Sequence, residues 1–163
     1  INEVVIQVQY IIRKYILALF AEMVVVAAAS CISFSIIGIR YAILLGLLTG
    51  ILNVIPYFGI FAALILTILV VIGTAAPGST IILVTIIVFI IHLLDGNVLK
   101  PFLIGARVKI NAFITLLSVI LGQMIWGISG MLLAIPVIAV CKILFDRIEA
   151  LKPWGLLLGD DKN

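Results

Sequence analysis

The chain has 163 residues, of which 66% are hydrophobic and only 10% are charged, with a net charge of +3. Soluble domains carry about 25% charged residues, so this composition argues against an ordinary soluble enzyme, a nucleic-acid-binding domain and a disulfide-stapled scaffold. Residues 41–94 and 110–141 contain no Asp, Glu, Lys or Arg, and a helix needs about 20 apolar residues to cross a bilayer. We therefore predict an all-α, polytopic membrane protein.

Apolar residues recur at helical spacing over residues 1–15, which predicts an amphipathic juxtamembrane helix. Residues 16–150 are expected to form a transmembrane core and residues 151–163 a cytoplasmic tail. The core contains six apolar segments, near residues 16–38, 40–55, 57–73, 79–98, 111–126 and 128–147. The string Asp95-Gly96-Asn97 is expected to weaken the end of the fourth segment.

Two segments are short. Segments 40–55 and 111–126 would extend only about 24 Å, against a hydrocarbon core of about 30 Å. The breaks that follow them, at Pro56 and at Gly127–Gly130, are tight and uncharged. We interpret both breaks as tips of short, broken helical hairpins. Such tips can be re-entrant, because irregular backbone at membrane depth is tolerated where protein or a water-filled cavity surrounds it.

A long segment followed by a broken pair occurs twice, in residues 16–73 and 79–147. The first unit would start on one side of the membrane and the second unit on the other. This pattern suggests inverted-topology repeats, which are common in secondary transporters. Gly46 and Gly50 form a G-x-x-x-G pair that predicts close helix packing.

The basic residues orient the segments. Alternating crossings place nine of them on one side: Arg13, Lys14, Lys100, Arg107, Lys109, Lys142, Arg147, Lys152 and Lys162. Only Arg40 falls on the other side. By the positive-inside rule the nine-residue side is cytoplasmic, and so is the carboxyl terminus.

A few polar residues interrupt the apolar segments. Glu22 lies roughly 12 Å beyond Lys14 along a helix, where a carboxyl either exchanges protons or cations or is paired structurally. His92 and Asp95 are one helical turn apart, and with Asn97 and Lys100 they could bind a small polar solute or relay protons. For His92 we favour the simpler interpretation of a hydrogen-bonded residue in the bundle.

The breaks supply the remaining candidates. Asn53 and Gln123 each lie beside a break, and Pro56–Gly59 and Gly127–Gly130 would be flexible tips. The full set of candidate pathway residues is Glu22, Asn53, Pro56, Gly59, His92, Asp95, Asn97, Lys100, Gln123, Gly127 and Gly130. Cys, His and acidic residues do not occur at the spacing of metal ligands. We therefore predict no metal, and we also predict no cofactor.

One string resembles an enzyme motif. Gly127-Ile128-Ser129-Gly130 has the G-x-S-G form of the rhomboid intramembrane proteases. A serine nucleophile needs a base within reach, and the single histidine, His92, precedes the serine instead of following it. We therefore predict no enzymatic activity.

Four motifs together resemble a known family. Asn53-Val54-Ile55-Pro56-Tyr57-Phe58-Gly59 is similar to the N-x-I-P-Y-x-G signature of the autoinducer-2 exporters, also called PerM-type permeases. The family's acidic-Gly-Asn-x-x-x-Pro stretch is matched by residues 95–101, and Gly105 fits its following glycine. Residues 127–136 resemble its closing G-x-x-G-M…A-x-P motif. Ala112 and His92 depart from the Pro and Gln of many relatives, and the tail from residue 145 to 155 resembles a Bacteroidetes-type branch.

The resemblance implies an integral membrane transporter of the bacterial inner membrane, expected to be a homo-oligomer because related proteins are pentamers. It also implies that the chain is the carboxyl-terminal part of a longer protein. Some relatives are linked to export of the furanone autoinducer-2 and others to sodium/proton antiport. The expected partners are the lipid bilayer and a small polar solute or a monovalent cation or proton, and not nucleic acid. A non-transporting membrane scaffold is the alternative from another class.

Overall fold

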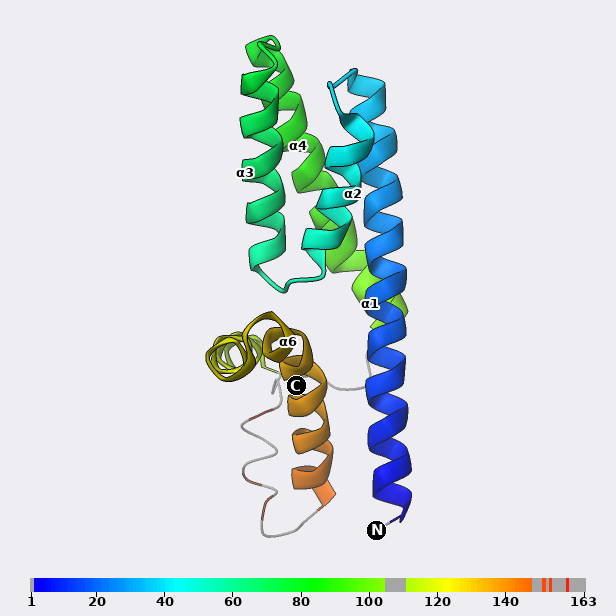
Figure 1. Cartoon of the computed structure of the whole chain (residues 1–163). Coiled ribbons are helices and arrows are strands. Elements are labelled where there is room, and N and C mark those ends of the chain that lie inside the picture. Colours follow the sequence, from blue (N-terminus) through cyan, green and yellow to red (C-terminus); the bar gives the residue numbers. More distant parts are fainter. Residues whose placement is uncertain (1, 105–110, 148–150, 152, 154–157, 159–163) are drawn as a thin grey trace. The chain divides into compact units, whose positions relative to one another are not determined.

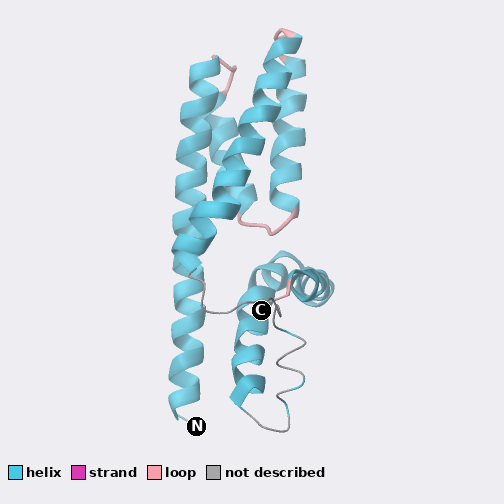
Figure 2. Cartoon of the chain, turned by 180° about the vertical axis from the view of Figure 1, so that it is seen from behind, coloured by secondary structure: helices cyan, strands magenta, loops and turns pink. Residues whose placement is uncertain are grey.

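The computed structural model describes residues 2–104, 111–147, 151, 153 and 158. These residues form helices and connecting turns without a β-strand, which confirms the all-α prediction (Figure 2). The elements are α1 (Asn2–Ile37), α2 (Ala42–Asn53), α3 (Phe58–Gly73), α4 (Gly78–Leu94), the π-helix η1 (Asp95–Leu99), α5 (Lys100–Ile104) and α6 (Ala112–Arg147). Gly105, Arg107, Lys109 and most of the predicted tail lie outside the described residues.

The chain divides into two compact units. One contains residues 18–103, and the other contains residues 1–17 and 104–163. We refer to them as the hairpin–helix unit and the α6 unit and describe each by itself. Helix α1 belongs to both, since it runs from Asn2 to Ile37 without a break.

In the hairpin–helix unit, α2 packs against α3, and α3 packs against α4 (Figure 1). Its apolar core contains Phe34, Ile39, Leu45, Val71, Val84 and Val88. Helix α2 also lies very close to α1, because a Cβ atom added at Gly46 would collide with Cys31, and one added at Gly50 would collide with Ala27. The packing role of the G-x-x-x-G pair is therefore confirmed.

The hairpin of α2 and α3 is shorter than the helices around it. Helix α2 has 12 residues and extends about 18 Å. The tip of the hairpin, residues 54–57, lies beside the middle of α1 rather than beside an end (Figure 1). Three other stretches are long and apolar enough to cross a membrane, namely Gln9–Ile37, Gly78–Phe102 and Ala112–Phe145.

The fourth predicted segment does not end near residue 98. The helical path continues from α4 through η1 and α5 as far as Ile104. The string Asp95-Gly96-Asn97 does not stop the helix but lies in its one widened turn. The predicted end near residue 98 was wrong, whereas the predicted weakening at Asp95-Gly96-Asn97 is present as a π turn.

The α6 unit contains the second hairpin. Helix α6 is interrupted at Gly127, whose φ of 62° and ψ of −141° are not helical and are accessible mainly to glycine. The chain folds back there, so that a Cβ atom on Gly130 would collide with the carbonyl of Gly122. Two helical arms therefore meet at Gly127, as the sequence predicts.

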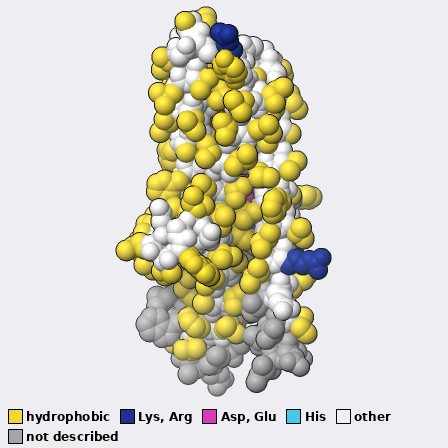
Figure 3. Space-filling model, viewed as in Figure 1, with side chains coloured by type: hydrophobic (Ala, Val, Ile, Leu, Met, Phe, Trp, Pro, Cys, Tyr) yellow, Lys and Arg dark blue, Asp and Glu magenta, His cyan; other side chains and the backbone are white. Residues whose placement is uncertain are grey.

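The surface is dominated by apolar side chains (Figure 3). Large hydrophobic residues are exposed on α1, α3, α4, α5 and α6, among them Ile36, Phe61, Phe89, Phe102, Met124 and Trp126. Water-soluble monomers rarely expose contiguous apolar patches of more than a few hundred Å². This surface is suited to contact with lipid.

Candidate functional site

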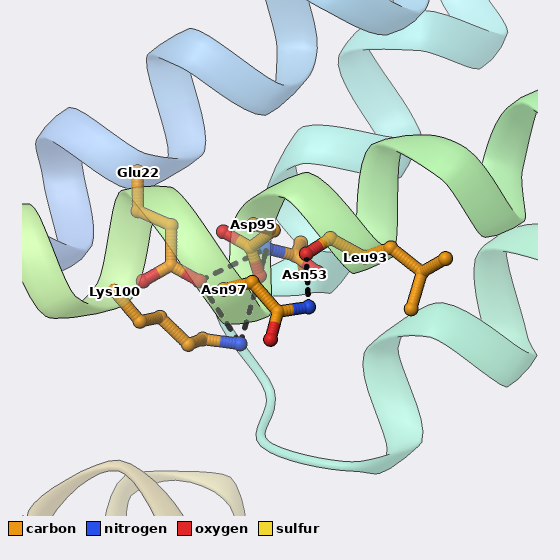
Figure 4. A network of polar contacts seen from close by, with 6 residues as sticks. All are labelled: Glu22, Asn53, Leu93, Asp95, Asn97 and Lys100. Atoms are coloured by element: carbon orange, nitrogen blue, oxygen red, sulfur yellow. Dashed lines mark hydrogen bonds and ion pairs between the residues drawn. The ribbon is translucent and has the colours of Figure 1, made fainter.

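Four polar side chains from four elements meet inside the hairpin–helix unit (Figure 4). They are Glu22 of α1, Asn53 at the end of α2, Asp95 of η1 and Lys100 of α5, and we call them the polar cluster. The amide Nδ2 of Asn53 donates to Glu22 Oε1 at 3.0 Å and to Asp95 Oδ2 at 3.3 Å. The ammonium Nζ of Lys100 lies 3.5 Å and 2.8 Å from the same two oxygens. Each of the two nitrogen donors thus contacts the same oxygen of Glu22 and the same oxygen of Asp95, and so bridges the two carboxylates.

The cluster is buried on its acidic side. Glu22 is 2% exposed and Asp95 is 0% exposed, whereas the Lys100 side chain is 40% exposed. The second oxygens of both carboxylates, Glu22 Oε2 and Asp95 Oδ1, are buried and have no hydrogen-bond partner among the described residues. Burying a charge costs several kcal/mol unless it is paired and hydrogen-bonded. One lysine therefore compensates two buried acids only in part.

The π-helix explains how Lys100 reaches Asp95. In an α-helix with 3.6 residues per turn, residues five apart point about 140° away from each other. In η1 the backbone N–H of Lys100 donates to the carbonyl of Asp95, which is the five-residue hydrogen bond of a π turn. The wider turn brings Lys100 back towards the face of Asp95. Such single π turns occur frequently at functional sites.

The tip of the first hairpin positions Asn53. Tyr57 has a φ of 63° and a ψ of −46°, and the N–H of Phe58 donates to the carbonyl of Pro56 at 2.7 Å. This is a strained γ-turn for a residue other than glycine. Gly59 then lies so close to the carbonyl of Leu52 that an added Cβ would collide with it. The tip is therefore tightly closed, and α2 ends at the level of Glu22.

Two predicted neighbours of Asp95 take no part in the hydrogen bonds and ion pairs of the cluster. Asn97 is exposed, and its Nδ2 donates to the carbonyl of Leu93 at 2.8 Å (Figure 4). His92 is half-buried, and its Nδ1 has no hydrogen-bond partner in the part of the chain that the structure describes. The sequence grouped Asp95 and Lys100 with these two residues, whereas the structure joins them to Glu22 and Asn53. No local sequence signal predicts that association.

The remaining candidates, Gln123, Gly127 and Gly130, lie in the α6 unit. Gln123 is exposed. The two glycines form a turn with features of the first hairpin, since each tip has a residue with positive φ followed by a glycine that approaches a backbone carbonyl. Tyr57 and Gly59 have these roles in one hairpin, and Gly127 and Gly130 have them in the other. This parallel supports the repeat hypothesis.

The polar cluster is suited to a small set of tasks. Two carboxylates, an amide and an ammonium can exchange a proton, hold a cation or hydrogen-bond the polar groups of a solute. Ionisable groups buried within apolar membrane-spanning segments commonly mark a transport pathway. The strained hairpin tip beside them adds to this inference, since backbone strain concentrates at functional sites.

Comparison with known proteins places the chain among membrane transporters. Residues 1–150 match the model of the AI-2E family transporter. The chain is 36% identical over 113 residues to "Putative transport protein YrrI" of Bacillus subtilis, covering 69% of this chain and 31% of that protein. It is 33% identical over 131 residues to "Putative permease PerM" of Escherichia coli, covering 80% of this chain and 37% of that protein.

The chain thus spans about a third of the length of these curated relatives. The match with the family extends across α1 to α6 and includes all four residues of the polar cluster. The chain therefore belongs to the AI-2E family of transporters.

Proposed function

We propose that the protein is a secondary transporter that exports a small polar solute from the bacterial cell, with the polar cluster as a working part of its pathway. The observation that carries this proposal is the burial of Glu22 and Asp95 at the tip of a short hairpin. The family and the names of the relatives indicate a transporter and not an enzyme. Alternating access would move this site between the two sides of the membrane.

A purely structural role for the cluster is less well supported. A membrane scaffold gains little from two buried acids, because replacing a buried ion pair with apolar residues is often neutral or stabilising. Interhelical polar contacts in bilayers contribute only about 0.6 kcal/mol on average. The cost of burying Glu22 and Asp95 is therefore better explained by a function that needs them.

The proposed substrate class follows from the family. Its namesake solute, the furanone autoinducer-2, is small, polar and rich in hydroxyl groups. Such a solute offers donors and acceptors that match carboxylate oxygens and an amide. We propose a solute of this class for this protein.

The proposed location is the inner membrane, with the basic ends of the segments in the cytoplasm. The positive-inside rule assigns the end of α1 that carries Lys14, and the end of α4–α5 that carries Lys100, to the cytoplasm. We also propose a homo-oligomer, pentameric as in related proteins. The exposed apolar side chains of the long helices offer surface for subunit contacts as well as for lipid.

The experiment that tests this function is solute efflux from proteoliposomes. The full-length protein is reconstituted into vesicles loaded with labelled autoinducer-2 and a labelled disaccharide that reports leakage. We expect autoinducer-2 to leave faster than it leaves protein-free vesicles, while the disaccharide stays inside. Equal efflux with folded, inserted protein and with empty vesicles would contradict the proposal.

A further inference from the structure

We propose that Glu22 and Asp95 together hold one exchangeable proton at neutral pH, with Lys100 as their fixed counter-charge, and that this proton is the coupling ion of transport. The coupling rests on the proposed function, whereas the proton count rests on the geometry of the cluster alone. Two carboxylates and one ammonium carry a net charge of −1, and both acids are at most 2% exposed.

A net charge buried in a low-dielectric interior raises the free energy of the folded state. One further positive charge would neutralise this site. The contacts show where that charge would go. Glu22 Oε1 and Asp95 Oδ2 already receive the two nitrogen donors. Glu22 Oε2 and Asp95 Oδ1 are the oxygens without a partner in the described part of the chain, so a proton on either one removes the excess charge.

The same contacts favour a proton over an alkali cation. Hard metal cations are held by a shell of several oxygen atoms. Here the two bridged oxygens face an ammonium and an amide N–H₂, which would repel a metal ion from that position. The two free oxygens are buried, and a proton needs no additional space.

The neighbouring elements offer one further group that could carry a compensating charge. Helix α1 contributes Glu22, α2 contributes the neutral Asn53, η1 contributes Asp95 and α5 contributes Lys100. Helix α4 contributes His92, which interacts electrostatically with both Asp95 and Lys100. A charged His92 would replace the proposed proton, so its substitution belongs in the test.

Exchange of the proton requires a path between the carboxyl groups and water. Release breaks the carboxyl O–H bond and transfers the proton to water, which leaves the cluster with its net charge of −1. The Lys100 side chain is 40% exposed and contacts one oxygen of each acid, so both acids lie one side chain from the exterior of the hairpin–helix unit, and the Lys100 ammonium keeps its own protons. Uptake from the other side of the membrane restores the neutral state.

The test counts protonated carboxyl groups by infrared spectroscopy. The full-length protein is studied at neutral pH in a detergent without ester groups, where exposed acids are ionised. The carbonyl stretching band of a buried, protonated carboxyl is identified by its shift in D₂O. We expect one such group in the wild type and none in Glu22→Gln or Asp95→Asn, since the remaining acid then pairs with Lys100. Because one of these variants could fail to fold, each serves as a check on the other.

Two further variants make the count decisive. Lys100→Met removes the counter-charge and should raise the count to two, whereas His92→Gln should leave it at one. A wild type without the band, or a band that persists in both acid variants, would overturn the inference. Loss of the band on adding sodium at constant pH would also overturn it, because a metal ion would then replace the proton. The infrared measurement is made without solute. The proposal of a shared proton can therefore be contradicted even when autoinducer-2 efflux is observed.

Discussion

Among single residues, Lys100 and Asp95 make the shortest contact of the cluster. Its 2.8 Å separation is that of a charge-assisted hydrogen bond. Lys100 also lies 3.5 Å from Glu22 Oε1, so one ammonium reduces the repulsion between two acids. The side chain is 40% exposed, and water therefore weakens its contribution compared with a fully buried ion pair.

We predict that Lys100→Met lowers the free energy of unfolding by about 1–3 kcal/mol at neutral pH. The substitution leaves Glu22 and Asp95 without their counter-charge. The melting temperature of the full-length protein in detergent measures the effect. Adding Asp95→Asn to Lys100→Met should restore part of the loss, because only one acid then remains.

The matched control is Lys14→Met, which removes an exposed lysine from α1. Its melting temperature should stay close to that of the wild type, since exposed charges contribute little to stability. Equal melting temperatures for Lys100→Met and Lys14→Met would contradict the structural account of the cluster.

At the scale of elements, two glycines close the tips of the two hairpins. Gly59 approaches the carbonyl of Leu52, and Gly130 approaches the carbonyl of Gly122. Because both obstacles are backbone atoms, neither can rotate away from a new methyl group. The tips therefore depend on glycine for close packing.

We predict that Gly59→Ala and Gly130→Ala each destabilise the protein by about 1–3 kcal/mol, the usual cost of overpacking. The control is Gly73→Ala in α3, where an added Cβ would have no atom within 4 Å and where alanine favours the helix. Melting temperatures in detergent compare the three variants. An unchanged melting temperature for both Gly59→Ala and Gly130→Ala would show that the tips are looser than described.

The elements also show what the sequence could and could not predict. The breaks at Pro56 and Gly127 were identifiable because proline and glycine have restricted or unusual backbone preferences. The π turn was not identifiable, since Asp95-Gly96-Asn97 suggested only a weakened end of the fourth segment. Only the widened turn brings Lys100 towards Asp95, and regular helical spacing would have pointed the two side chains apart.

In the whole molecule, every member of the polar cluster is a sequence candidate, but the sequence groups only Asp95 with Lys100 and does not associate them with Glu22 and Asn53. Charged or amide side chains are unusual within apolar segments, and that rarity drew attention to Glu22, Asn53 and Asp95. Their meeting requires the hairpin to end beside the middle of α1, which links residues 31 and 42 positions apart in sequence. Contacts of this range depend on packing and have no local signature.

The proposed membrane orientation also belongs to this scale. We predict that a cysteine at Ser79, exposed at the start of α4, reacts with an impermeant maleimide added outside intact cells. A cysteine at Lys14 should react only after the membrane is opened, because the positive-inside rule places it in the cytoplasm. Cys31 and Cys141 are replaced by alanine in this background. The reverse labelling pattern would show that the membrane topology is opposite to the proposed one.

If the polar cluster serves transport, solute efflux from proteoliposomes must depend on Asp95, which Asp95→Asn tests. The control is Asn97→Ala, two residues away, since Asn97 is exposed and its side chain hydrogen-bonds only the carbonyl of Leu93 among the described contacts. The account predicts at least a tenfold loss of autoinducer-2 efflux for Asp95→Asn, with a folded protein, and efflux within twofold of the wild type for Asn97→Ala. Full efflux by Asp95→Asn would contradict the claim and remove this carboxyl from the mechanism.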